Sequence, residues 1–226
     1  MQNVRPLNIG YILLLLILPA FGSAAGDTTQ LKAANAIAKT ADNSNQTVTK
    51  PLPYYSQLDN QNKPASTCSV TSLAMVTDFF GITQPSDTVR VPDQLYQRYG
   101  LLQDVPVLSG AFNQLALEAG STARATGLTN GTFAQLQEHV SKGLPAIVHG
   151  WFTPPGHILV VTGYDGEYYR VHDPYGKWDL TKFGGYDTSV SGKNMRYPKA
   201  EFEHAINDNG TGDDLWLHLF APQTAD

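Results

Sequence analysis

Apolar residues recur at helical spacing in four stretches of the chain, and each stretch predicts a helix. The predicted helices are Ser69 to Phe80, Pro92 to Tyr99, Ala111 to Ala119 and Thr132 to Ser141. Later stretches are apolar and rich in β-branched and aromatic residues, which predicts strands. The predicted strands are Ala146 to Phe152, His157 to Tyr164, Glu167 to His172 and Leu215 to Phe220. Helices followed by strands in hairpins indicate an α+β fold, with an antiparallel sheet and a cleft between the helical and sheet halves.

The amino-terminal residues show a different pattern. An apolar run from Ile9 to Leu18 follows the basic residue Arg5 and precedes Pro19 and the small residues 22–25. This layout is typical of a secretory signal peptide over residues 1–25. The run is too short to span a bilayer, and an uncleaved anchor is the alternative. We therefore expect an exported protein, secreted or periplasmic, without a membrane span once the signal is removed.

Composition divides the rest of the chain in two. Residues 26–50 are small and polar, which predicts a flexible linker or a short pro-segment. Residues 51–226 are rich in aromatic residues, glycine and proline, and they are numerous enough for one monomeric domain with one core. The chain has 15 Lys and Arg against 20 Asp and Glu, and this acidic balance argues against a nucleic-acid partner.

The single cysteine, Cys68, is the first candidate for chemistry. One cysteine cannot form an internal disulfide, so in an exported protein a reactive thiol competes with a buried apolar role. Val70, Leu73 and Val76 continue a helical pattern from this point, and Ser66 or Thr67 can cap its start. In the first turn of a helix, free backbone N–H groups and the helix dipole stabilise a thiolate, which is the nucleophilic form.

A nucleophilic cysteine needs a base, and the base needs an orienting group. His157 begins the segment GHILVVTGYDGEYYRVHDPYG, which predicts a hairpin that ends at Asp173. Side chains alternate between the two faces of a strand, so an odd connection or a bulge is needed to place His157 and Asp173 on one face, unless Asp173 lies past the strand end, where the alternation lapses. A two-residue turn would place them on opposite faces.

Three motifs, PYYSQLDN with TCSVTSLAM, GHILVVTGY and VHDPYG, then give the chain a family resemblance. Between Pro53 and Tyr175 it resembles papain-like cysteine peptidases related to the bacteriocin-processing, double-glycine leader peptidases, in their stand-alone exported branch. The resemblance implies a papain-like fold in which the nucleophile helix packs on an antiparallel sheet. It implies that Cys68 is the nucleophile, His157 the general base and Asp173 the group that orients the imidazole.

The family also places a glutamine upstream of the cysteine, where its amide joins the backbone N–H of the cysteine in an oxyanion hole. By this resemblance the glutamine is Gln57, which follows an aromatic pair. The interval from Gln57 to Cys68 is longer than usual in the family, and Gln61 is the competing candidate. Ser69 stands where many members have glycine, which leaves the N–H donor in place.

The expected function is that of an exported cysteine peptidase acting on a peptide or protein, with no cofactor and no metal. A transglutaminase-like or phytochelatin-synthase-like acyltransferase shares the Cys, His, Asp order. A catalytically silent peptide-binding module of the same fold is the third possibility. No metal-ligand spacing surrounds His149 or His172, so packing or a polar place in the substrate cleft is the expected role of both.

Overall fold

The protein is described here from a computed structural model that covers residues 51–223. The expected signal peptide and the expected linker or pro-segment lie outside the described residues. Within residues 51–223, none of the helices combines the length and hydrophobicity that a bilayer crossing requires.

The helices lie mostly in the first half of the domain. They are the short 3₁₀ helix η1 (Gln57–Asp59), α2 (Cys68–Phe79), α3 (Val91–Tyr99), α4 (Val105–Glu118), α5 (Phe133–Ser141) and α6 (Lys199–Ile206). The four helices predicted from the hydrophobic pattern are all present. Helix α4 begins six residues earlier than predicted, because a proline in its first turn starts a helix well and the following residues are also apolar.

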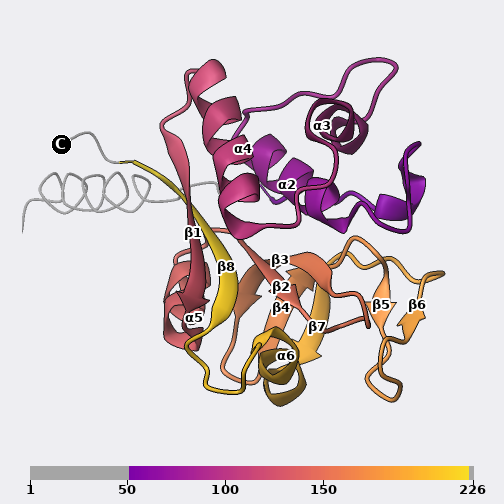
Figure 1. Cartoon of the computed structure of the whole chain (residues 1–226), viewed down its shortest axis with the longest axis vertical. Coiled ribbons are helices and arrows are strands. Elements are labelled where there is room, and N and C mark those ends of the chain that lie inside the picture. The colour runs from indigo at the N-terminus through magenta and orange to yellow at the C-terminus, as the bar shows by residue number, and fades with distance from the viewer. Residues whose placement is uncertain (1–50, 224–226) are drawn as a thin grey trace, which may run out of the picture. The chain divides into compact units, whose positions relative to one another are not determined.

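One six-stranded antiparallel sheet forms the second layer, in the order β1-β8-β2-β3-β4-β7. Its strands are β1 (Ala123–Gly131), β2 (Ala146–Gly150), β3 (His157–Tyr164), β4 (Tyr168–His172), β7 (Met195–Pro198) and β8 (Leu215–Pro222). A separate two-stranded sheet pairs β5 (Lys177–Trp178) with β6 (Tyr186–Asp187). This small sheet lies beyond β7 in Figure 1.

Helices cover both faces of the large sheet (Figure 1). Helices α2, α3 and α4 pack on one face around a core that includes Leu73, Phe112 and Ile147. Helices α5 and α6 pack on the other face around a second core that includes Leu159 and Phe202. Two separate cores arise because alternate residues of each central strand point to opposite faces.

Helix ends follow their local sequence signals with one exception. Thr132 and Gln135 form a capping box at the start of α5, and Gly81, at a φ of 69°, follows the end of α2. The prediction that Ser66 or Thr67 caps α2 is wrong. Thr67 does occupy the N-cap position, but its hydroxyl donates to the carbonyl of Lys63 instead of accepting from the helix.

The pairing of β3 with β4 contains a bulge, one of the predicted alternatives, and Asp173 also follows the last residue of β4. Pairing runs from Tyr164 with Tyr169 to Gly163 with Arg170, and then shifts by one residue at Thr162. After the shift, Val160 pairs with His172, so the next residue along, Asp173, falls on the same face as His157. The bulge therefore does what an odd turn was predicted to do.

Candidate active site

Cys68 is the first residue of α2, and its thiol is free and half-buried. The first backbone hydrogen bond of the helix runs from the Thr71 N–H to the Thr67 carbonyl at 3.0 Å. The N–H groups that precede Thr71 in the helix therefore have no intrahelical partner. The thiol thus lies at the positive end of the helix, as predicted. It also lines a cavity of about 280 Å³ together with His157.

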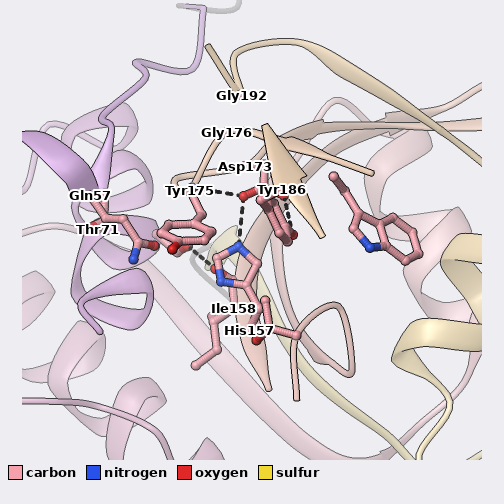
Figure 2. Close-up of polar contacts among 12 residues, drawn as sticks. Gln57, Thr71, His157, Ile158, Asp173, Tyr175, Gly176, Tyr186 and Gly192 are labelled. Atoms are coloured by element: carbon pink, nitrogen blue, oxygen red, sulfur yellow. Dashed lines mark hydrogen bonds and ion pairs between the residues drawn. The ribbon is translucent and has the colours of Figure 1, made fainter. Parts of the chain in front are cut away.

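His157 and Asp173 form a hydrogen-bonded ion pair in the interior. His157 Nε2 donates to Asp173 Oδ1 at 2.8 Å, and both side chains are almost fully buried. Figure 2 shows this contact as the dashed line between the imidazole and the carboxylate. Because Nε2 is taken by Asp173, Nδ1 is the nitrogen left over, and Cys68 is near enough to contribute to the raised pKa of His157.

Four donors satisfy the Asp173 carboxylate. Oδ1 accepts from His157 and from the backbone N–H of Tyr175 at 3.0 Å. Oδ2 accepts from the hydroxyls of Tyr186 and Tyr197, each at 2.9 Å. A fully buried carboxylate is stable only when it is paired and hydrogen-bonded in this way.

Charge sets the protonation states of this group. Burial by itself lowers the pKa of His157, but the Asp173 charge, the hydrogen bond to Asp173 and the nearby Cys68 together raise that pKa to about 10. Burial and the same Asp173 charge raise the pKa of Tyr186 and of Tyr197. Both tyrosines therefore stay neutral and act as donors to the carboxylate, while the imidazole holds its proton.

The backbone of Asp173 is held by two neighbouring segments. Its N–H donates to the Gly192 carbonyl at 2.9 Å, and its carbonyl accepts from the Tyr54 hydroxyl at 3.1 Å. The Gly192 N–H in turn donates to the Tyr54 hydroxyl oxygen at 3.0 Å. A Cβ at Gly192 would overlap the Asp173 carbonyl, so this close approach requires glycine.

The structure separates the two candidate glutamines. Gln57 is buried, its backbone N–H donates to the Pro174 carbonyl at 2.8 Å, and its Nε2 donates to the Pro64 carbonyl at 2.8 Å. One Nε2 hydrogen remains, and Oε1 is buried without a partner among the described residues. Gln61 is exposed. Gln57 is therefore the glutamine placed beside the turn from Asp173 to Tyr175, as Figure 2 shows.

Buried polar contacts fix the long segment between Gln57 and Cys68. Asn60 Nδ2 donates to the hydroxyls of Thr67 and Thr71, each at 2.9 Å. Asp93, at the start of α3, accepts from the backbone N–H of Gln61 at 2.9 Å. These contacts fold the long segment between Gln57 and Cys68 compactly, so that Gln57 occupies a buried position despite the length of the segment.

The cavity beside Cys68 opens between the helical and sheet halves, where the cleft was predicted. Its further lining residues come from the segment before α4, from β2, from the β2–β3 connection, from the α6 end and from β8: Gln103, Asp104, His149, Gly150, Trp151, Pro155, Gly156, Ile158, Ala205, Ile206, Asp208 and Trp216. Trp151 and Trp216 are both partly exposed in this cleft. The Trp151 indole N–H donates to Asp208 at 3.0 Å. Aromatic and polar walls around a free thiol suit an elongated organic ligand.

His172 has a packing role. Its Nδ1 accepts from the backbone N–H of Asn194 at 3.1 Å, so its Nε2 is the donor to the carbonyl of Leu52 at 3.2 Å. His149 lines the cleft instead. Within residues 51–223 no cluster of three or more His, Cys, Asp or Glu side chains is placed to hold a metal ion.

Sequence reasoning missed the tyrosines that hold Asp173. Tyr186 and Tyr197 lie 13 and 24 positions after it, on β6 and β7. No spacing rule connects a hydroxyl to a carboxylate across separate short strands.

Comparison with known proteins gives one family match. The model of the Peptidase_C39-like family matches residues 49–205. No curated protein matches the chain in sequence.

Three solved structures resemble the chain at 18% sequence identity. A C39-like peptidase from Bacillus anthracis has a TM-score of 0.49, with 77% of this chain and 96% of that chain covered. A double glycine motif protease from an AMS/PCAT transporter, solved with its leader peptide, has a TM-score of 0.45, with 77% and 94% covered. The peptidase domain of Streptococcus ComA, a bifunctional ABC transporter, has a TM-score of 0.46, with 70% and 93% covered.

Proposed function

The chain belongs to the Peptidase_C39-like family, and from that premise we propose that it is an exported cysteine peptidase that cleaves a peptide bond through Cys68, His157 and Asp173. Family membership makes it a cysteine peptidase-type hydrolase. The observation that carries the residue assignment is the orientation of His157, whose Nε2 is bound to Asp173, which leaves Nδ1 for Cys68 in the cavity that both residues line. The export part rests on the sequence pattern of residues 1–25.

The proposed acylation step begins from a thiolate and an imidazolium. Cys68 Sγ attacks the carbonyl carbon of the substrate, a C–S bond forms, and the carbonyl π electrons move to oxygen. When the tetrahedral intermediate collapses, the C–N bond breaks and the amine leaves with the proton from His157 Nδ1. The role of Asp173 is to orient the imidazole, because its carboxylate already accepts hydrogen bonds from four donors.

Deacylation uses the same residues in reverse. The imidazole is now neutral, and its Nδ1 accepts a proton from a water molecule as the oxygen of that water attacks the thioester carbon. Collapse of the second intermediate releases the carboxylate product and restores the thiolate and the imidazolium. Asp173 keeps Nε2 protonated, so Nδ1 is the nitrogen that exchanges protons at each step.

The oxyanion of both intermediates requires donors already in place. The backbone N–H of Cys68 lies at the free end of α2, and Gln57 Nε2 retains one hydrogen after its bond to Pro64. Gln57 is held through both its backbone and its side chain, which suits a preorganised donor. One such donor is worth on the order of a hundredfold in rate.

Cleavage of a mixed peptide library by the purified protein tests this function, with products identified by mass spectrometry. Cleavage that disappears in Cys68→Ser supports a thiol peptidase. Adding glycine amide to the reaction separates the chemistries, because an acyltransferase would attach the added amine to the new carboxyl end and a hydrolase would leave a free acid. A protein that binds peptides without cleaving them, and whose Cys68 shows no unusual reactivity, would be a silent binding module.

A further inference from the structure

Three polar side chains that the proposed mechanism does not use, two of them buried and the third half-buried, lead from the protein interior to the cleft. Ser109 lies on α4, His218 on β8 and His149 at the cleft end of β2. Ser109 Oγ lies 2.8 Å from His218 Nδ1, and His218 Nε2 lies 2.9 Å from His149 Nε2. The three residues form one continuous chain of hydrogen bonds.

The position of each proton along these hydrogen bonds follows from the acceptor that is available to the Ser109 hydroxyl. Among residues 51–223, His218 Nδ1 is its one hydrogen-bond partner. A buried hydroxyl hydrogen is costly to leave unpaired, so Ser109 donates and His218 Nδ1 accepts. His218 then carries its hydrogen on Nε2 and donates to His149 Nε2. His149 must therefore carry its own hydrogen on Nδ1.

Both imidazoles are neutral in the folded protein. Burial lowers the pKa of His149 to about 4. Burial, and then the neighbouring His149, lower the pKa of His218 well below its ordinary value. A neutral imidazole has one donor nitrogen and one acceptor nitrogen, as the assignment of the protons requires.

The Nδ1–H of His149 is left for a ligand. Nε2 is occupied by His218, Nδ1 has no partner among the described residues, and it is not one of the buried unpaired atoms. The ring itself lines the cavity that holds Cys68 and is fixed by an edge contact with Trp216, with ring centroids 5.6 Å apart. Gly150, the next residue of β2, pairs with His157, so His149 and His157 leave opposite faces of the sheet at its edge, and both residues line the same cavity.

We propose that His149 is a substrate-binding residue whose Nδ1–H donates a hydrogen bond to a backbone carbonyl oxygen of the peptide in the cleft. Ser109 and His218 are positioning residues that hold His149 in the donor tautomer. This inference rests on the proposed peptidase function, because it takes the ligand of the cleft to be a peptide. A carbonyl is the matching partner, since it offers an acceptor at every residue of any peptide, whatever its side chains.

The tautomers can be read directly by ¹⁵N NMR of the full chain labelled at histidine. The proposal expects the proton of His149 on Nδ1 and that of His218 on Nε2. In Ser109→Ala the hydroxyl is gone, and both rings should shift toward a mixture of tautomers. The reverse assignment in the wild-type protein, with His149 protonated at Nε2, would overturn the proposal whatever the enzyme does.

Binding of the carbonyl is tested by alkylating Cys68 with two matched reagents. Bromoacetyl-triglycine amide carries a peptide backbone, and bromoacetamide carries the same reactive group without it. The ratio of their rate constants measures the contribution of the backbone and corrects for any change in the thiol. We expect His149→Ala to lower this ratio about threefold to tenfold, the worth of one neutral hydrogen bond.

His149→Asn is the conservative variant, because its side-chain amide can present an N–H near the place of Nδ1. It should recover most of the wild-type ratio, and Ser109→Ala should lose less than His149→Ala. An unchanged ratio in His149→Ala would overturn the proposal even if both reagents label the thiol fast. Slow labelling of the wild-type protein by bromoacetamide would instead count against the peptidase function itself, and the NMR assignment would still test the tautomer.

Discussion

His157 and Asp173 lie 16 positions apart in the sequence, and their side chains meet at 2.8 Å because a bulge at Thr162 changes the register between two strands. Without that shift the turn would direct the two side chains to opposite faces of the sheet. The bulge therefore contributes to the geometry of the His157–Asp173 pair. It places a buried carboxylate behind the imidazole and leaves Nδ1 for the thiol.

Gln57 should matter to catalysis and Gln61 should not. Gln57→Ala removes a proposed oxyanion donor, so we expect kcat to fall on the order of a hundredfold with a smaller change in KM. Gln61 is exposed, and Gln61→Ala should stay within about twofold of the wild-type kcat. Steady-state kinetics on one peptide found by the library test would measure both. Equal losses in the two variants, or a loss confined to Gln61→Ala, would contradict the assignment.

The tyrosines on Asp173 should stabilise the folded protein. Tyr186→Phe and Tyr197→Phe each remove one hydrogen bond to Oδ2, and a bond to a charged group is worth about 1.5–3 kcal/mol. Urea unfolding should show a loss of that order for each variant. The double variant should lose more than the sum, because Oδ2 would then be buried without a donor. Strict additivity would mean that water replaces the missing hydroxyls.

Glycine is required at position 192 for a steric reason. Gly192→Ala would push its Cβ into the Asp173 carbonyl, so the carboxylate should move and activity should fall at least tenfold. Gly110 is the matched control, because it lies in α4 with open space around its Cβ position. Gly110→Ala should keep activity and gain about 0.5–1 kcal/mol of stability. A fully active Gly192→Ala would show that Asp173 does not need its present position.

The histidine pair beneath the cleft should make the fold sensitive to acid. The pKa of His149 is about 4 in the folded protein and near 6.5 when unfolded, so between these values the unfolded chain binds more protons. Stability should therefore fall as the pH drops from 6.5 to 4, on the order of 2 kcal/mol from His149. His149→Gln, which cannot titrate, should lose less stability over that interval. The difference between the two unfolding free energies should be constant above pH 7 and should change between pH 6.5 and 4. A difference that stays constant through the acid range would argue against a neutral His149.

The family and fold could be predicted from the sequence, and both predictions are confirmed by the family match. Three motifs in order identified the family, and strong periodicity located the central elements, such as α2 and β3. Strand β1 was missed because ARATGLTNG is poor in strand-forming residues. Its pairing with β8 and the close packing of Gly127 against Ser109 are tertiary effects, which override local propensity.

Only the site residues that belong to sequence motifs could be predicted. Cys68, His157 and Asp173 lie where the motifs indicate, and their catalytic roles stay predictions. The tyrosines on Asp173 and the chain from Ser109 to His149 could not be predicted, since each joins elements far apart in the sequence. Such contacts depend on strand order and helix packing, which no local pattern encodes.

The most direct test of the central claim is the pH dependence of iodoacetamide alkylation at Cys68, compared between the wild-type protein and His157→Ala. A thiolate held by the imidazolium should label rapidly at pH 6, well below the ordinary thiol pKa near 8.5. His157→Ala should label at least tenfold more slowly at pH 6 and approach the wild-type rate only near pH 8.5 and above. Identical rate profiles in the two proteins would contradict the Cys68–His157 pair and the peptidase mechanism built on it.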